Sequence, residues 1–190
     1  MKKIQKLSSY LLITFNILLI AIPLLVAVQW IFIKTKTTDV DDLINTFRLF
    51  ERMIETPEGY VNLSELNWTI GLKILGFSAD ILSLMPFILS LFVLKSIFKN
   101  YQKGEIFNAI NAIHYRKLGW LFFLDALLVK SLSNTLMILT ATLTKPGYRY
   151  INISFGTPNM ESLFYGTLLI VISWIMLEAS KLHDDQKFII

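Results

Sequence analysis

Four long stretches of the chain are almost free of charged residues, and this pattern limits the fold more than any other feature. Residues 10–33 carry no charge, and the apolar pattern that starts at residue 162 runs to about residue 180. Residues 68–94 and 118–144 each hold one lysine and one aspartate. A helix crosses the hydrocarbon core with about 20 apolar residues. We therefore predict four transmembrane helices over these ranges.

The composition excludes a water-soluble fold. Charged residues make up 17% of the chain and hydrophobic residues 54%, whereas soluble domains carry about 25% charged residues. Cysteine is absent, which excludes disulfides and thiolate metal sites. Lys2, Lys3 and Lys6 precede the first span as in a secretory signal, but its uncharged run exceeds the usual length of about 7–15 residues. We expect a signal anchor that stays attached.

Basic residues divide unevenly between the two sides of the predicted spans. The side with both termini and the 95–117 loop holds ten basic and four acidic residues, and the side with loops 34–67 and 145–161 holds six basic and eight acidic ones. Lysine and arginine near spans stay in the cytoplasm, so we predict that both termini are cytoplasmic. The net charge of +4 then indicates contact with anionic lipid, not with nucleic acid.

Small and polar residues recur in every predicted span at alternating steps of three and four. Such residues let helices approach closely in lipid, and the spacing predicts a left-handed crossing of about 20°. We predict one integral membrane domain over residues 1–190, a four-helix transmembrane bundle; the alternative is that small residues are simply common in spans. The predicted interior residues, span by span, are Asn16, Ile20, Pro23, Ala27, Trp30; Lys73, Gly76, Asp80, Ser83, Phe87, Ser90; Gly119, Phe123, Ala126, Lys130, Ser133, Met137, Thr140, Thr144; and Gly166, Ile170, Ser173, Leu177, Ser180.

The two outer loops are predicted to form a small extracytoplasmic cap. Apolar residues at helical spacing predict an amphipathic helix over residues 40–54, ended by a turn at 56–59. Alternating residues in the 145–160 loop predict a short strand that pairs with residues 60–63 in a β-hairpin. We expect Phe47 and Phe50 of the helix to pack against the aromatic residues of the second loop; the alternative is that the helix lies on the outer leaflet of the membrane.

Two charged residues fall near the middle of neighbouring spans. Asp80 and Lys130 have equal counted depth and lie on the predicted interior faces, which makes them candidates for an ion pair. Each alone near the bilayer centre costs about 2.5–3.5 kcal/mol. Asp125, Asn16 and Ser173 are secondary polar candidates. The pair is either part of a polar pathway or a structural contact that fixes helix register.

No constellation in the sequence predicts catalysis or a cofactor. The two aspartates lack the Gly-x-Gly-Asp context of intramembrane proteases, and neither Gly-x-Ser-Gly nor His-Glu-x-x-His is present. The only histidines, His114 and His183, lie in predicted cytoplasmic segments. We expect a protein that is not an enzyme, without metal, haem or other cofactor.

The 95–117 segment carries a motif that resembles a known family. Gly104-Glu-Ile-Phe107, Asn111, Arg116 and Gly119, with the tail from Leu182 to Ile190, are similar to the signature of a bacterial four-span membrane family, domain of unknown function 2975. The tail departs from the family pattern at its usual threonine. The resemblance implies a bacterial inner membrane protein with no established activity. Members of this family are often encoded beside small helix-turn-helix regulators, and this resemblance implies a cytoplasmic protein partner.

We therefore carry two functional hypotheses. The first is a regulatory or sensory partner of a cytoplasmic protein, docked through Gly104, Phe107, Asn111 and Arg116, in a chain that either stays monomeric or oligomerises. The second is a small transporter or an ion- or proton-conducting subunit that uses the intramembrane aspartates and Lys130.

Overall fold

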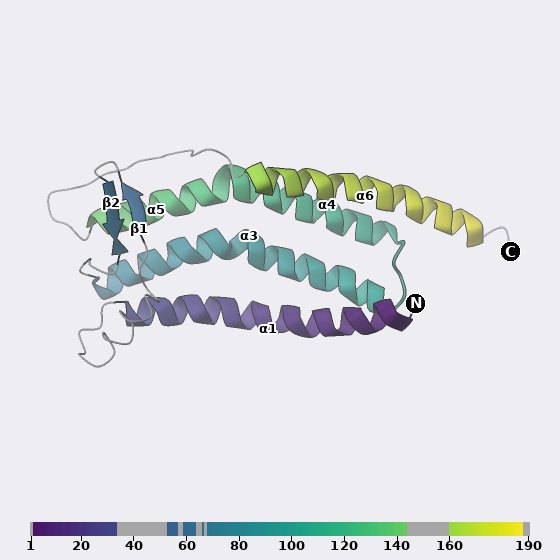
Figure 1. Ribbon diagram of the computed structural model, residues 1–190, viewed down its shortest axis with the longest axis horizontal. Coiled ribbons are helices and arrows are strands. Elements are labelled where there is room, and N and C mark those ends of the chain that lie inside the picture. Colours follow the sequence, from purple (N-terminus) through teal and green to yellow (C-terminus); the bar gives the residue numbers. More distant parts are fainter. Residues whose placement is uncertain are drawn as a thin grey trace. The chain divides into compact units, whose positions relative to one another are not determined.

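The computed structural model describes residues 2–33, 53–56, 59–63, 66, 68–143 and 160–187 (Figure 1). Four helical stretches among them are long and apolar enough to cross a membrane. This confirms the predicted fold class, an all-α membrane protein with four spans. The elements are α1 (Lys2–Phe32), β1 (Met53–Thr56), β2 (Gly59–Asn62), α3 (Ile70–Gln102), α4 (Ala109–Leu124), the π-helix η2 (Asp125–Val129), α5 (Lys130–Leu143) and α6 (Met160–Lys187).

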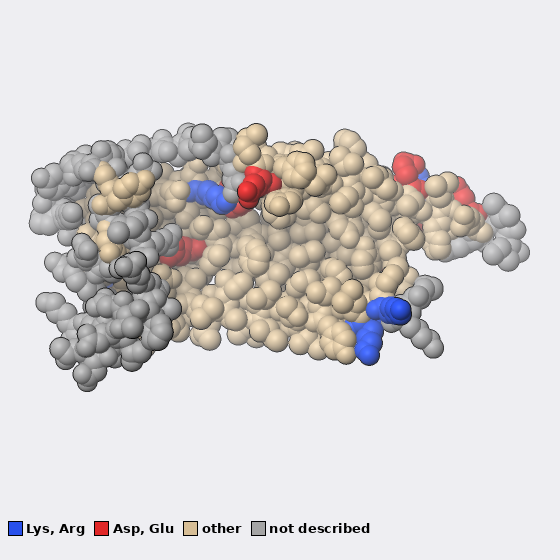
Figure 2. Space-filling model, in the orientation of Figure 1, with Lys and Arg blue, Asp and Glu red and all other residues tan. Residues whose placement is uncertain are grey.

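The helices extend beyond the predicted apolar stretches. α1 begins at Lys2, α3 continues to Gln102 and α6 continues to Lys187, so polar turns prolong each span. Much of the surface between these polar ends is uncharged, although acidic and basic side chains interrupt it (Figure 2). Long apolar side chains such as Ile17, Ile20 and Phe92 are exposed on it, which is typical of side chains that face lipid.

The chain divides into two compact units, and each is described separately. Unit 1 contains the first part of α1, the second part of α3, α4, η2 and α6, and unit 2 contains the rest of α1 and α3, the hairpin and α5. The division falls beside Pro23 in α1, beside Pro86 in α3 and at the end of η2. Regular helical hydrogen bonding is interrupted at prolines and π-helices.

In unit 1, α4 and α6 approach closely through two glycines. A Cβ atom placed on Gly119 would lie 2.7 Å from Ile170 Cγ1 and 2.8 Å from the carbonyl oxygen of Gly166. A Cβ atom on Gly166 would in turn lie 3.0 Å from the carbonyl oxygen of Gly119. The predicted use of small residues for helix contact is therefore confirmed at this crossing.

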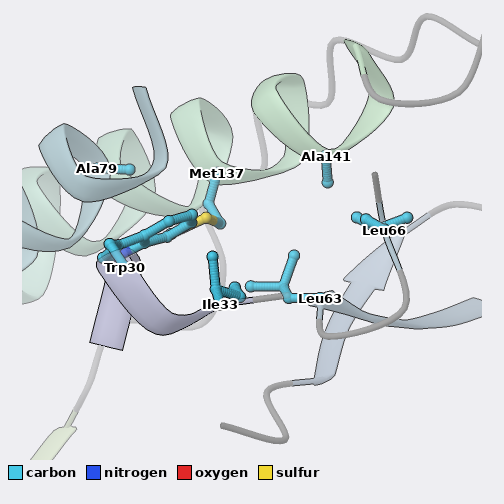
Figure 3. Packing of buried hydrophobic residues seen from close by; sticks show 7 residues of the cluster. All are labelled: Trp30, Ile33, Leu63, Leu66, Ala79, Met137 and Ala141. Carbon is cyan, nitrogen blue, oxygen red and sulfur yellow. The ribbon is translucent and has the colours of Figure 1, made fainter. Parts of the chain in front are cut away.

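In unit 2, a buried apolar cluster joins three helices to the segment that follows the hairpin. Figure 3 shows the ring of Trp30 beside Met137 and the side chain of Ile33 turned toward Leu63. Leu63 and Leu66 are buried in this cluster, so part of the first loop packs onto the helices, as a cap requires. The cluster is made of Trp30, Ile33, Leu63, Leu66, Ala79, Met137 and Ala141.

The β-hairpin differs from the predicted one. β2 pairs antiparallel with β1 of the same loop, with Glu55 opposite Tyr60 and Thr56 opposite Gly59. Residues 53–54 are therefore a strand, not the end of the predicted helix, and the turn at 56–59 closes a hairpin. A two-residue connection costs less chain entropy than pairing with a distant loop. The rest of the predicted helix and the whole 145–159 segment lie outside the described residues.

The predicted interior face of the first span is wrong in its first half. Asn16 and Ile20 are exposed, whereas Ser8 and Phe15 are buried; in the second half, the predicted interior residue Trp30 is buried. Lipid and protein interior are equally apolar, so small and polar residues did not identify the packed face. The Phe15 ring instead packs edge-on against Phe98 of α3, with ring centroids 5.5 Å apart.

We predict that Gly119→Ala destabilises the protein, because the added methyl group meets the backbone oxygen of Gly166 at van der Waals overlap. Overpacking of this kind costs about 1–3 kcal/mol. Thermal unfolding in detergent measures the effect. Gly71→Ala is the matched control, since no atom lies within 4 Å of its added methyl group. Equal melting temperatures for the two variants would contradict the close crossing.

Candidate functional site

A buried carboxylate lies at the centre of unit 2. Asp80 of α3 is 6% exposed, and its Oδ2 accepts a hydrogen bond from Nε1 of Trp30 in α1 at 2.7 Å. A buried charge is costly without such partners, and hydrogen bonds to charged groups are the stronger ones. The indole N–H therefore stabilises Asp80 inside the apolar part of the chain.

Neighbouring residues fix the position of the Trp30 ring. Gly76 lies one turn before Asp80, and the indole occupies the space that a side chain at Gly76 would fill. On its other side the ring meets Trp68 edge-on, with centroids 5.0 Å apart. Trp68 Nε1 donates to the carbonyl oxygen of Leu63 at 2.7 Å. One indole thus links α1 and α3 to the buried segment after the hairpin.

The predicted Asp80–Lys130 ion pair stays a prediction. Lys130 is the first residue of α5 and is half-buried. Three residues later, Ser133 Oγ donates to the carbonyl oxygen of Ala79 at 2.8 Å. This contact holds the first turn of α5 against the turn of α3 that carries Asp80, which favours the pairing. A charge swap, Asp80→Lys with Lys130→Asp, tests it.

The secondary polar candidates have different environments. Asp125 is half-buried and begins the π-helix, where its backbone N–H reaches the carbonyl oxygens of Leu121 and Phe122. Ser173 is wholly buried in α6, and within the described ranges its Oγ has no hydrogen-bond partner. Asn16 is exposed. Among the secondary candidates, burial therefore favours Ser173 and not Asn16.

The Trp30–Asp80 contact was not predicted, because counting residues along each span assumes that neighbouring spans begin at the same depth in the membrane. Lys73 of α3 donates to the carbonyl oxygen of Ile31, near the end of α1, at 3.2 Å. The end of α1 therefore lies level with Lys73, one turn into α3. The long indole reaches Asp80 from there. A buried tryptophan N–H needs a hydrogen-bond acceptor. The place of Trp30 on the predicted interior face was therefore the one feature of the sequence that pointed to this contact.

A second polar cluster, in unit 1, shapes the turn between α3 and α4, which we call the α3–α4 turn (residues 103–108). Asn111 of α4 is wholly buried. Its Nδ2 donates to the carbonyl oxygens of Glu105 at 2.8 Å and Ile106 at 3.0 Å, and its Oδ1 accepts from Asn100 at 2.7 Å. One amide therefore satisfies two turn carbonyls and ties them to the end of α3.

Further contacts brace the same turn. Gly104 has a φ of 87°, a left-handed conformation that glycine adopts without strain. Asn108 caps α4, since its side chain accepts from the N–H of Ile110 at 2.9 Å. The hydroxyls of Tyr101 and Tyr115 lie 2.8 Å apart. The turn therefore has one defined shape.

The four predicted docking residues split into two pairs. Gly104 and Asn111 build the turn itself, as just described. Phe107 is exposed in the turn and Arg116 is exposed further along α4, and the Phe107 ring lies 6.3 Å from that of His183 in the tail of α6. The sequence grouped all four as docking residues, although among them only Phe107 and Arg116 have exposed side chains.

Histidine and carboxylate side chains do not gather into a metal centre in the described ranges. No group of three or more of them has a spacing suited to a metal ion there. On the exposed tail of α6, an ion pair joins Lys181 Nζ to Glu178 Oε1 at 2.8 Å.

Comparison with known proteins identifies the family. Residues 52–190 match the family described as protein of unknown function (DUF2975). The chain belongs to this family. The match covers the hairpin, α3, α4, η2, α5 and α6, and the resemblance seen in the sequence is confirmed. No curated protein and no solved structure matches the chain.

The structure gives physical roles to the residues that carried the DUF2975 resemblance. Gly104 supplies the left-handed turn, Asn111 satisfies the turn carbonyls, and Gly119 permits the close contact with α6. These three positions are architectural. Glu105, Phe107 and Arg116 are exposed positions of the same central motif.

We predict that Trp30→Phe lowers stability by about 2 kcal/mol, because the buried Asp80 carboxylate loses a charge-assisted hydrogen bond. Asp80→Asn should cost less, since an amide oxygen still accepts from the indole. Thermal unfolding in detergent measures both. Trp120→Phe is the control, because Trp120 is exposed; if it costs as much as Trp30→Phe, the hydrogen bond is not the cause.

We predict that Asn111→Ala loosens the α3–α4 turn, because the carbonyl oxygens of Glu105 and Ile106 lose their donor. Hydrogen exchange of the amides of residues 103–108 should become faster, and trypsin should cleave sooner after Lys103. Asn16→Ala, at an exposed position, should change neither. Unchanged exchange in Asn111→Ala would show that the turn does not depend on this amide.

Proposed function

We propose that this multi-pass membrane protein is a non-enzymatic regulatory or sensory subunit that binds a cytoplasmic protein at the α3–α4 turn. In this proposal the protein lies in a bacterial inner membrane, with both termini and the turn in the cytoplasm. The excess of lysine and arginine on that side of the spans supports the orientation. A helix-turn-helix regulator is the partner that the family resemblance suggests.

The observation that carries the proposal is a rigid turn with an exposed apolar and basic surface. Asn111 and Gly104 fix the backbone, so the turn pays little entropy to adopt a binding shape. Phe107, Ile110 and Ile113 are exposed at successive steps of three in and after this turn. Arg116 continues the series and is exposed as well. Aromatic and arginine side chains are the residues that contribute most at protein interfaces.

The tail of α6 enlarges this surface. Residues 181–186 are helical and exposed, and His183 lies against Phe107. The tail carries both signs of charge, which suits selective recognition of a protein more than attraction to an anionic membrane. Mixed charge beside apolar side chains therefore supports a protein partner.

Photocrosslinking in growing cells tests the proposal. Benzoylphenylalanine placed at Phe107 should give an adduct with a soluble cytoplasmic protein, and Arg116→Glu should reduce that adduct. The matched control is the same residue at Phe92, which is also exposed but lies in the apolar part of α3. If position 107 yields lipid adducts alone, as position 92 should, the proposed partner surface is wrong.

A transporter is the second candidate, and one observation favours it. The π-helix η2 begins at the intramembrane Asp125, and π-helical turns inside helices are frequent at functional sites. Against it, Leu63 and Leu66 are buried in the apolar cluster of unit 2, and an apolar cluster is a poor lining for an aqueous path. Proton flux into proteoliposomes that contain the protein, and the loss of this flux in Asp125→Asn, would establish this alternative.

A further inference from the structure

A shallow groove of about 300 Å³ runs along α1 and α3 in unit 2. This volume lies at the lower end of the range for small-molecule sites, about 300–1,000 Å³. The exposed surface of the lining is apolar, and Lys73, its one charged residue, lines the groove mainly with its aliphatic stem. The lining residues are Ala27, Trp30, Ile31, Ile70, Lys73, Ile74 and Phe77.

The groove faces the surroundings of the spanning helices. Ile31, Ile70 and Ile74 are largely exposed along it, and all belong to helices long and apolar enough to cross a membrane. From Ile70 to Phe77 the helix rises about 10 Å. The groove therefore has the dimensions of a slot for part of one acyl chain.

Lys73 is the one positively charged residue of the groove lining. Its Nζ donates to the carbonyl oxygen of Ile31 near the end of α1, and this bond uses one of three N–H groups. The other polar hydrogen in the lining, on Trp30 Nε1, is already donated to Asp80. Lys73 thus has N–H groups for an anionic ligand, whereas the indole has none.

We propose that this groove binds an anionic phospholipid, with an acyl chain along Ile74 and Phe77 and the phosphate beside Lys73. Apolar walls fit the chain, and the lysine complements the headgroup. Lys73 lies in the first turn of α3, where a lysine at the end of a span reaches the headgroup level. The site is separate from the partner surface, so the inference does not rest on the proposed function.

Quenching of Trp30 fluorescence by brominated lipid tests the proposal. A variant with Trp68, Trp120 and Trp174 changed to phenylalanine keeps Trp30 as its single tryptophan. In phosphatidylcholine vesicles with a minor fraction of phosphatidylglycerol, bromine on the phosphatidylglycerol chains should quench about threefold more per lipid than bromine on phosphatidylcholine. One partly exposed ion pair gives a preference of that size.

Variants at Lys73 separate the site from general lipid contact. Lys73→Gln should abolish the preference and Lys73→Arg should keep it. Lys99→Gln, at an exposed lysine near the other end of α3, should leave it unchanged. Equal quenching by the two lipids before any change at Lys73, or a preference that survives Lys73→Gln, would overturn the proposal.

Native mass spectrometry of the chain with all four tryptophans guards against damage from their removal. It should release phosphatidylglycerol later than phosphatidylcholine, and Lys73→Gln should remove this difference. A dimer that forms without bound lipid and is lost in Ala27→Phe would assign the groove to a second copy of the chain and also overturn the proposal.

Discussion

The hydrogen bond from Trp30 to Asp80 is the contact on which the packing of unit 2 depends. It satisfies a carboxylate that an apolar environment would otherwise penalise, and it requires the indole to lie flat over Gly76. The ring then offers its edge and face to Trp68 and to the apolar cluster with Leu63 and Met137. The hydrogen-bonding requirement of one carboxylate in α3 thus decides that the Trp30 face of α1 is buried, and it positions the ring beside which Leu63 and Leu66 pack.

Hydropathy predicted the spans well because the bilayer imposes one simple requirement on every segment that crosses it. The stepped small residues also identified the buried faces around Gly76 and Asp80, Ser133 and Met137, and Gly166 and Ser173. Close approach between helices needs small side chains, and the sequence displays them directly. Polar prolongations such as the one from Lys181 to Lys187 were missed, since a helix outside the membrane has no apolar run to reveal it.

Features that depend on how two helices lie against each other could not be predicted from the sequence. One such feature is the offset between α1 and α3, which places the end of α1 level with Lys73 and brings the Trp30 indole to Asp80. The exposed position of Asn16 is another such feature, because any apolar face of α1 can lie against lipid. The hairpin was assigned to a distant strand although its own loop supplied one. In the DUF2975 motif, similarity of residues suggested a common binding role, whereas burial separates Asn111, which builds the turn, from Phe107, which it displays.

The chain order of Trp30 and Asp80 has a consequence for membrane insertion. A helix with an aspartate deep inside it is a poor substrate for entry into lipid on its own. α1, which carries no acidic residue, is synthesised before α3 and enters without such a penalty. Its indole N–H is therefore already in the bilayer when Asp80 arrives. The first helix lies outside the region matched to the family, yet it supplies the hydrogen-bond donor for a buried carboxylate of the second.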